Sequence, residues 1–462
     1  MKEVLEKRIE EIEKIADDMG IDYYPLNYEI VPQETMLEVI SYGLPTRARH
    51  WSYGQSYDYQ KMQGEMGFSK IYEVVLNNDP SYAFLLDTNS DIANTMVSAH
   101  VVGHSCFFKT NFLFKKTDNK MVYHAAERAR RIEDYIQKYG LKAVEKIMDI
   151  GFALEKHIDW HKGLERNPKK KKEKTLVRTE LDEFDDLLGE EELFYKLMFV
   201  KKTLFPSSPE YDLIWFLINY SKSLEPWQMD VLEIIRQESY YFYPQYMTKI
   251  MNEGFASFIH AEIMLKLGCL HDHEYLDFCK IHEKVVQPGA NKLSINPYFL
   301  GFSIFTEIRE KWDEKYKNGE SEINGLQKIF QIVEKEDDIS FIRNYLTEDL
   351  AKELKLFSYE NIKASNGDQA VHIIGTELDQ VKEAIIKDLY NYRSPLICVT
   401  SVEDGILQLK HMSANIGTLD EKHIKVVMKY IYKLWENPIN LEALDSDGST
   451  IHYTFDEAGF SD

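Results

Sequence analysis

The chain is poor in cysteine and has no long apolar run. Its 462 residues include four cysteines, and no two of them form a Cys-x-x-Cys pair. A zinc ribbon is therefore excluded, and a disulfide framework is not expected. No uninterrupted stretch of about 18 apolar residues is present, so we expect no membrane span. Because residues 1–20 also lack an apolar signal core, a reducing, cytoplasmic location fits the sequence.

Basic residues are outnumbered by acidic ones. The chain has 55 Lys and Arg against 77 Asp and Glu, which gives a formal net charge of −22. Such a surface repels nucleic-acid phosphates and anionic lipid, so we expect neither nucleic acid nor a membrane surface as a partner. The chain also has no GxSxG, P-loop or GxGxxG motif. Function must therefore be sought in other residues.

Most of the first 355 residues have the apolar spacing of helices. The segments with this spacing are 2–19, 92–114, 121–139, 141–161, 210–221, 226–240, 244–267, 272–285, 297–316, 322–334 and 338–354. Pro226 and Pro244 each suit a first helical turn. We therefore expect a large, mainly α-helical N-terminal domain at residues 1–355.

Three parts of that domain depart from the helical pattern. Residues 21–60 are rich in Tyr, Pro and Gly, so irregular structure is expected there. Residues 72–76 and 83–86 have the composition of two short strands. Residues 162–208 are strongly charged and end near two prolines, which predicts a linker or an insertion.

The pattern changes after residue 355. Strand-like segments are 370–374, 396–400, 406–411, 440–444 and 449–455, and amphipathic helices are expected at 378–390 and 419–435. This order predicts one small sheet with helices on one face. We therefore expect a small α+β C-terminal domain at residues 356–462.

Two histidines in the predicted helix 92–114 form the sharpest local motif. His100 and His104 are four residues apart, so both imidazoles lie on one helical face and can reach one metal ion. Glu253 lies in a second apolar helix, followed by a glycine that costs about 1 kcal/mol there relative to alanine. A Glu-Gly-aromatic-Ala helix supplies the third ligand in several zinc peptidases, so the set resembles a zincin-like helical core. Zn²⁺ is the ion most expected, with Fe²⁺ or Mn²⁺ as alternatives.

The motif departs from zinc peptidases at one position. In HExxH the glutamate after the first histidine activates the metal-bound water, whereas this chain has Val101 there. Another carboxylate would have to replace it, and Glu238 is the candidate acid/base. Tyr241 is a candidate oxyanion donor. If neither acts, the metal site is retained without peptidase chemistry.

Other polar side chains on apolar helices have two interpretations. They are His124, Glu127, His260 and His282. Each is either a metal ligand, or a hydrogen-bond partner of one, or a core residue that pairs with a neighbouring polar group. A dense patch that is a pocket wall, an anion site or a packed polar turn is formed by Arg47, Arg49, His50 and Trp51.

Longer strings, in a defined order, carry a family resemblance. They are Arg49-His-Trp-Ser-Tyr-Gly54, Ala99-His-Val-Val-Gly-His-Ser-Cys-Phe-Phe-Lys-Thr-Asn111, His124-Ala-Ala-Glu-Arg128, Glu210-Tyr-Asp-Leu-Ile-Trp215, Trp227-Gln-Met-Asp230, Glu238-Ser-Tyr-Tyr-Phe-Tyr-Pro-Gln245, Thr248-Lys-Ile-Met-Asn-Glu-Gly-Phe-Ala256, Asn296-Pro-Tyr298 and Tyr432-Lys-Leu-Trp435. Between residues 20 and 458 the chain resembles the SpoVR family (stage V sporulation protein R). Phe255 stands where the family usually has Trp.

The resemblance implies a process and leaves the mechanism open. It implies a role in sporulation, specifically spore-cortex formation, or in a stress module of non-sporulating bacteria. It also implies a PrkA-like serine kinase and a von Willebrand-type protein as partners. The main hypothesis is a regulator or partner-binding protein with a His/His/Glu metal site. The alternatives are a metal-dependent hydrolase and a metal-dependent oxidoreductase, because two His and one carboxylate also hold Fe²⁺.

Overall fold

The computed structural model describes most of the chain. The described residues are 2–65, 73–166, 205–289, 295–363, 369–387, 389–390, 394–412, 419–444 and 448–461. The chain divides into two compact units, and each combines two stretches: 1–145 with 240–393, and 146–239 with 394–462. The domain boundary expected at 355/356 stays a prediction, and the expected linker at 162–208 lies largely outside the described residues.

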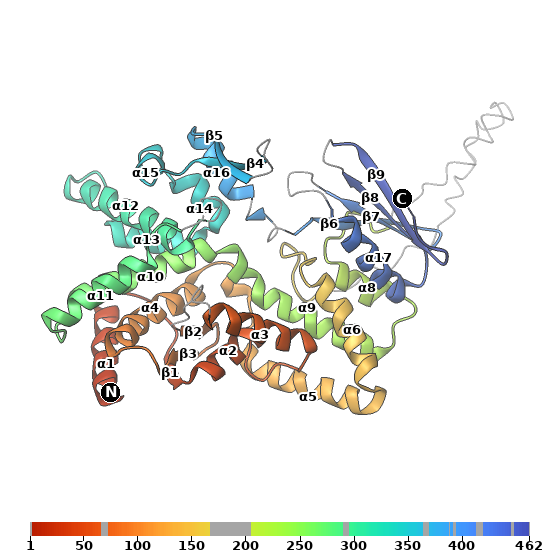
Figure 1. Ribbon diagram of the computed structural model, residues 1–462, viewed down its shortest axis with the longest axis horizontal. Helices are drawn as coiled ribbons and strands as arrows, with labels where there is room; N and C mark the ends of the chain where they lie inside the picture. Colours follow the sequence, from red (N-terminus) through yellow and green to blue (C-terminus); the bar gives the residue numbers. More distant parts are fainter. Residues whose placement is uncertain are drawn as a thin grey trace, which may run out of the picture. The chain divides into compact units, whose positions relative to one another are not determined.

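Helices dominate the first unit (Figure 1). Those lying wholly within it are α1 (Lys2–Asp18), α2 (Gln33–Tyr42), α3 (Trp51–Glu65), α4 (Asp91–Thr110), α5 (Met121–Tyr139), α10 (Lys249–Lys266), α11 (Asp272–Val285), α12 (Pro297–Lys317), α13 (Gly325–Lys335), α14 (Asp338–Tyr345), α15 (Glu348–Glu353) and α16 (Leu378–Lys387). Both α6 (Leu141–Leu154) and α9 (Pro226–Met247) have residues in each unit. The expected mainly helical N-terminal region is confirmed. No helix among the described residues is long and apolar enough to cross a membrane.

A small mixed sheet accompanies these helices. Strands β1 (Leu26–Val31), β3 (Ser81–Leu86) and β2 (Glu73–Leu76) lie in that order, with β1 parallel and β2 antiparallel to β3. The two expected short strands are therefore confirmed. The expectation of irregular structure at residues 21–60 was wrong, because β1, α2 and most of α3 lie there. Pairing with β3 stabilises β1, and local composition does not reveal such a tertiary partner.

Helix α4 is the centre of the first unit. Buried residues make up 17 of its 20 positions, which is typical of a helix enclosed by others on all sides. The hydroxyl of Ser90 accepts from the amide of Ala93 and begins the helix. Asn111 ends it, because its side-chain amide donates to the carbonyls of Val333 and Glu336. The sequence predicted this helix as one buried element, and that prediction is confirmed.

Glycines set the distance between the central helices. Helix α10 packs against both α4 and α12 (Figure 1). A Cβ atom on Gly103 of α4 would lie 2.6 Å from the Cα of Ala256 in α10. A Cβ on Gly254 of α10 would lie 2.3 Å from the Cα of Gly301 in α12. These contacts explain why glycine is kept inside buried helices at a cost in propensity.

The second unit contains a five-stranded sheet. Its strands lie in the order β10 (Gly459–Ser461), β9 (Thr450–Asp456), β8 (Ile439–Leu444), β7 (Ile406–His411) and β6 (Ile397–Glu403), and α17 (Glu421–Trp435) connects the parallel pair β7 and β8. Helix α8 (Leu213–Tyr220) belongs to the same unit. The expected C-terminal α+β region is confirmed in this form.

Two details of the predicted elements were wrong. Strands β4 (Ser358–Lys363) and β5 (Gln369–Gly375) form a separate two-stranded sheet and belong with α16 to the first unit. The strand expected at 370–374 was predicted to join the same sheet as the later strands, and that prediction was wrong. Pro244 lies inside α9 and does not begin a helix, whereas Pro226 does begin α9. A short-range pattern does not specify which strands pair or how far a helix continues.

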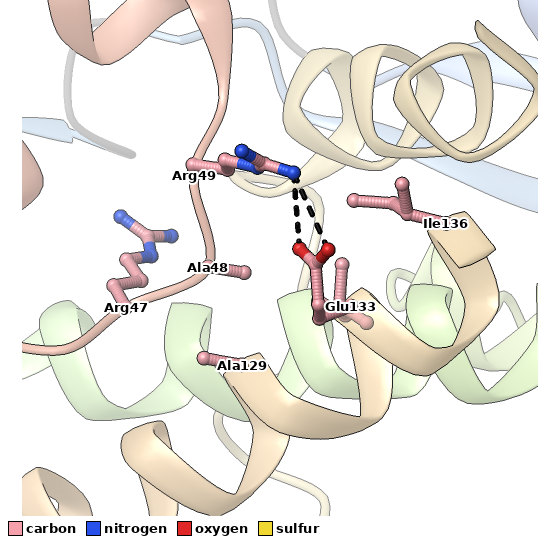
Figure 2. A pocket seen from close by; sticks show the side chains of 7 residues that line it. Arg47, Ala48, Arg49, Ala129, Glu133 and Ile136 are labelled. Atoms are coloured by element: carbon pink, nitrogen blue, oxygen red, sulfur yellow. Dashed lines mark hydrogen bonds and ion pairs between the residues drawn. The ribbon is translucent and has the colours of Figure 1, made fainter. Parts of the chain in front are cut away.

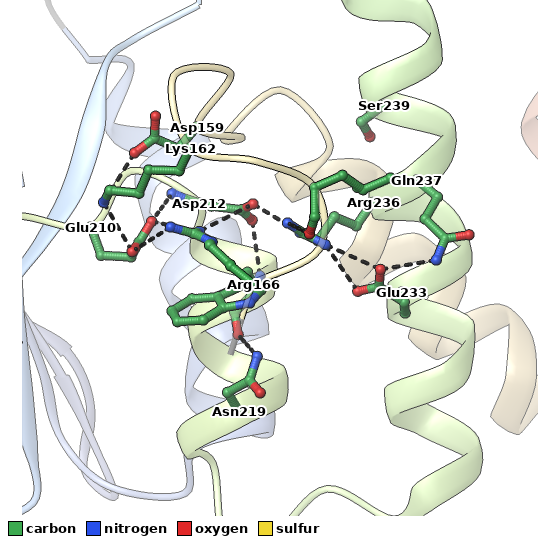
Figure 3. A network of polar contacts seen from close by, with 12 residues as sticks. Asp159, Lys162, Arg166, Glu210, Asp212, Asn219, Glu233, Arg236, Gln237 and Ser239 are labelled. Atoms are coloured by element: carbon green, nitrogen blue, oxygen red, sulfur yellow. Dashed lines mark hydrogen bonds and ion pairs between the residues drawn. The ribbon is translucent and has the colours of Figure 1, made fainter. Parts of the chain in front are cut away.

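A buried ionic network stabilises the second unit (Figure 3). The side chain of Asp212 is fully buried, and Nε of Arg236 donates to it at 2.8 Å. The other carboxylate oxygen of Asp212 accepts from the amide of Trp215 at the start of α8. Arg166 makes a bidentate pair with Glu210 at 2.9 and 3.0 Å, and its guanidinium lies 3.9 Å from the Trp215 ring centroid.

We expect Arg236→Met to lower the free energy of unfolding of this unit by about 3–5 kcal/mol, because Asp212 would lose its closest cation while staying buried. Urea denaturation followed by intrinsic tryptophan fluorescence measures the change. Lys162→Met is the matched control, because Lys162 pairs with Glu210 with a side chain that is 34% exposed and should cost under about 1 kcal/mol. Equal effects of the two substitutions would contradict the prediction.

Candidate metal centre

Helices α4 and α10 bring the three predicted ligands together. His100 and His104 lie one turn apart on α4, and their rings are 4.5 Å apart between centroids. Oε2 of Glu253 lies 3.7 Å from Nε2 of His100 and 3.4 Å from Nε2 of His104. The spacing-based expectation that these side chains share one location agrees with the structure. Their role as metal ligands stays a prediction.

The structure adds a fourth side chain, which the sequence analysis missed. Glu73 begins β2, and its Oε1 lies 3.8 Å from Nε2 of His100. Glu73, His100 and His104 can each present one ligand atom within 4.8 Å of the others. The only local signal was a carboxylate at the start of an otherwise apolar strand. That signal does not tell which helix the strand will meet.

Two buried atoms at this centre have no hydrogen-bond partner. They are Nε2 of His100 and Oε2 of Glu253, which face each other. A buried polar atom without a partner is costly, and an ion bound between them would satisfy both. Ligand atoms about 2.1 Å from one tetrahedral ion lie about 3.4 Å apart. The observed separations of 3.4 to 3.8 Å are therefore close to those of a metal-bound set.

Neighbouring polar groups orient both imidazoles. Nδ1 of His104 lies 2.9 Å from Oδ1 of Asn252, an acceptor, so Nδ1 carries the proton and Nε2 presents its lone pair to the centre. Nδ1 of His100 lies 2.9 Å from Nδ1 of His260. Nε2 of His260 lies 2.7 Å from Nδ1 of His282 in α11. Hydrogen-bonded outer partners of this kind are typical of histidines that bind metals.

Two more residues fix the helices that carry these groups. The carboxylate of Asp338 accepts from the amides of Ile250 and Met251, both at 2.8 Å, and so caps the start of α10 one turn before Glu253. Oδ1 of Asn296 accepts from the amide of Tyr298 at the start of α12. The Tyr298 ring then stacks on His100, with centroids 6.1 Å apart.

The centre contains a preformed charge pair. Burial by itself would raise the pKa of Glu253, but the close approach and charge of His100 and His104 outweigh it and hold this pKa well below its usual value. Burial would likewise lower the pKa of His104, but Glu253 and Asn252 outweigh it and raise this pKa. Glu253 and His104 thus favour each other's charged forms, and a metal cation can take the place of a proton on Nε2 of His104.

The other two groups favour their neutral forms. Burial and the charge of His104 together lower the pKa of His100 to about 4, although Glu253 opposes the change. Burial raises the pKa of Glu73 to about 7, although the charge of His104 opposes the change. A carboxyl group whose pKa lies near neutrality can take up and release a proton under working conditions.

The residues predicted for catalysis lie in other surroundings. Tyr241 is buried, and its hydroxyl donates to the carbonyl of Asn77 at 3.0 Å. Glu238 is buried in the part of α9 that belongs to the second unit. The acid/base role of Glu238 and the oxyanion role of Tyr241 stay predictions.

Of the additional candidates, two reach the centre through hydrogen bonds and two do not. His260 and His282 are the pair described above. His124, near the start of α5, pairs with Asp118. Glu127 lies one turn further along α5. Neither α5 residue belongs to the group that the structure assembles around His100.

Two residues of the predicted patch, Arg47 and Arg49, line a pocket, whereas His50 and Trp51 do not (Figure 2). Arg47, Ala48 and Arg49 face α5 residues across a cavity of about 300 Å³. Both arginines already have partners. Arg49 forms an ion pair with Glu133 at 3.2 Å, and Arg47 donates to the carbonyl of Tyr42 and lies over the rings of Tyr53 and Phe242. The pocket-wall expectation agrees with this geometry, and no unpaired anion site is evident in it.

Two imidazoles and one carboxylate on packed helices, with a second carboxylate from strand β2, define a mainly helical protein with a candidate divalent-metal centre. The chain belongs to the SpoVR-like family, because the family model described as SpoVR like protein matches residues 1–394. The chain is also 28% identical to the uncharacterized protein YcgB of Escherichia coli (strain K12), over 487 aligned positions that cover 97% of this chain and 93% of that protein. No solved structure matches the chain. The predicted family is thus confirmed, and neither name states an activity.

Proposed function

We propose that this protein is a metal-dependent hydrolase that holds a divalent cation, most simply Zn²⁺, with His100, His104 and Glu253. The observation that carries the proposal is the pair of buried atoms without partners, Nε2 of His100 and Oε2 of Glu253. The imidazole and carboxylate donors suit Zn²⁺, Fe²⁺ or Mn²⁺. The substrate class is an amide bond in a peptide or a peptidoglycan precursor.

Glu73 is the residue that makes hydrolysis chemically reasonable. A bound metal would supply Lewis acidity and a water of lowered pKa. Glu73 lies on the same centre and can accept the proton of that water, which Val101 cannot do. Val101 stands where HExxH motifs have a glutamate, and Glu73 on strand β2 supplies the missing carboxylate. His104 is oriented by Asn252, so its lone pair stays directed at the ion.

Metal analysis of the purified protein tests the proposal. We expect about one divalent ion per chain, as in three-ligand sites of this kind, and its loss in His100→Ala and in Glu253→Ala. Inductively coupled plasma mass spectrometry measures the content, and circular dichroism checks that each variant is folded. His124→Ala is the matched control, since it removes an imidazole that pairs with Asp118.

The proposal fails if the folded protein binds no Zn²⁺, Fe²⁺ or Mn²⁺ on reconstitution. It also fails if the control loses metal to the same extent as the ligand variants. Hydrolysis is assayed separately, as new amino groups released from short peptides and from muropeptide stem peptides.

A second candidate is a regulator without catalysis. The specific observation in its favour is the number of side chains at the centre: if Glu73 binds the ion, four protein ligands close the coordination sphere, as in structural zinc sites. The metal would then stabilise the fold, and the protein would act through its partners. Metal content together with hydrolysis separates the two candidates.

Membership of the family supports the same biological role for the hydrolase and for the regulator. We propose a role in spore-cortex formation or in a stress response, with a PrkA-like serine kinase and a von Willebrand-type protein as partners. This proposal rests on the family resemblance. A cytoplasmic location, suggested by the small number of cysteines, is part of the same proposal.

A further inference from the structure

Three histidine rings form a chain that leads away from the candidate centre. His100 and His260 meet through their Nδ1 atoms at 2.9 Å, and Nε2 of His260 meets Nδ1 of His282 at 2.7 Å. His100 and His260 are 3% and 0% exposed, so water cannot take the place of either contact. Each contact needs one proton between two nitrogens, because an imidazole nitrogen either donates or accepts.

Aromatic side chains hold the outer rings in place. Phe278 contacts both His260 and His282, with ring centroids 6.3 and 5.7 Å apart. Phe302 meets His282 edge-on at 5.0 Å. This packing restricts rotation of the rings, so each nitrogen keeps its neighbour.

Only two arrangements of three neutral rings satisfy both hydrogen bonds. In the first, Nδ1 of His100 donates to His260, Nε2 of His260 donates to His282, and His282 keeps its proton on Nε2. In the second, Nδ1 of His282 donates to His260, Nδ1 of His260 donates to His100, and His100 keeps its proton on Nε2. The direction of one hydrogen bond therefore dictates the direction of the other.

We propose that His260 and His282 are positioning residues that lock His100 in its metal-binding tautomer, and that metal binding reverses the protonated nitrogen of all three rings together. A metal binds a lone pair, so Nε2 of His100 must be free of its proton, which selects the first arrangement. In the metal-free protein Nε2 of His100 faces Glu253, which favours the second. The inference rests on the proposed metal centre.

Protons balance in this change. Nε2 of His100 releases one proton as the ion arrives. One proton moves from Nδ1 of His260 to Nδ1 of His100, and one moves from Nδ1 of His282 to Nε2 of His260. Nε2 of His282, which is half-buried on α11, takes up one proton from solvent. Metal binding at the buried centre thereby changes which nitrogen of His282, a residue nearer the surface, carries the proton.

Long-range ¹H–¹⁵N correlation spectra of ¹⁵N-histidine-labelled full-length protein test the inference, because they distinguish the two tautomers of each ring. Zn²⁺ alone is the probe. We expect His282 to carry its proton on Nδ1 in the metal-free protein and on Nε2 after addition of Zn²⁺. In metal-free His260→Phe protein, which offers His282 no acceptor, His282 should lose its Nδ1 proton.

Affinity provides the second measurement. Loss of a hydrogen-bonded partner of a ligand typically weakens metal binding about 10–100-fold, so we expect an effect of this size in His260→Gln and one near the lower end in His282→Phe. His273→Phe, on the same helix, is the control and should change nothing. If Zn²⁺ binds and the tautomer of His282 does not change, this inference is overturned and the metal centre stands. If Zn²⁺ does not bind, both are overturned.

Discussion

Glu73→Gln is expected to keep the metal and to lower hydrolysis by about 10²–10⁴-fold, the usual contribution of a positioned general base. Glutamine has nearly the same shape as glutamate but cannot accept a proton from water. The three remaining ligands would be unchanged, so the ion should stay bound. Metal content and the rate of peptide hydrolysis, measured on the same preparation, give both quantities.

The same variant separates the catalytic from the regulatory function. If Glu73 is a fourth ligand, its replacement should lower metal content or affinity, and the hydrolase proposal would lose its base. Glu29→Gln is the matched control, because Glu29 lies on β1 of the same sheet and is exposed. An equal loss of activity in the control would remove the argument for Glu73.

Acidification is expected to destabilise the metal-free protein steeply between pH 6.5 and 4. Burial lowers the pKa of His100 to about 4, with help from His104, lowers that of His282 to about 4, and holds that of His260 well below its usual value. In the unfolded chain these imidazoles take up protons below about pH 6.5. The unfolded state then binds more protons than the folded state, so stability falls as pH falls.

Each such histidine changes the free energy of unfolding by about 1.4 kcal/mol per pH unit within this window. Glu73 opposes the trend. Burial raises its pKa to about 7, so its contribution is present below the unfolded pKa and is lost as pH rises through about 7. Asp338 opposes the trend as well, because burial raises its pKa to about 8. His157 adds to the loss, because burial lowers its pKa to about 4. Four histidines outweigh two carboxyl groups, which leaves a net loss of stability on acidification.

Urea denaturation in EDTA at pH 6.5 and pH 5 measures this effect. His282→Phe should reduce the pH dependence by roughly one histidine's share, while His423→Ala, which removes a ring that is 87% exposed, should leave it unchanged. A free energy of unfolding that is constant or rises on acidification would show that the buried histidines are not neutral in the folded state.

Some of the candidate centre was predictable because helical geometry is local. Four residues make just over one turn, so His100 and His104 had to share a face once their segment was helical. The position of Glu253 beside a glycine also indicated a buried helix under an unusual constraint. The structure identifies that constraint as the contact between Gly254 and Gly301.

Other parts of the centre depend on contacts that no local pattern encodes. Glu73 reaches His100 because β2 pairs with β3 and the sheet lies against α4. His282 reaches His260 because α11 packs beside α10, and the exchange of hydrogen bonds between them needs both helices in place. Predictions for Glu238 and Tyr241 rested on chain proximity to Glu253, and such proximity does not specify the direction of a side chain.

The sequence by itself determined the family, the mainly helical character and the placement of His100 and His104 on one helical face. These follow from composition, from ordered motifs and from a periodicity of a few residues. Only the tertiary structure decided the second carboxylate of the centre, the histidine chain and the division into two units that each combine separate stretches. The reason is physical: these features depend on packing between elements distant in the chain, where glycine contacts and strand pairing set the distances.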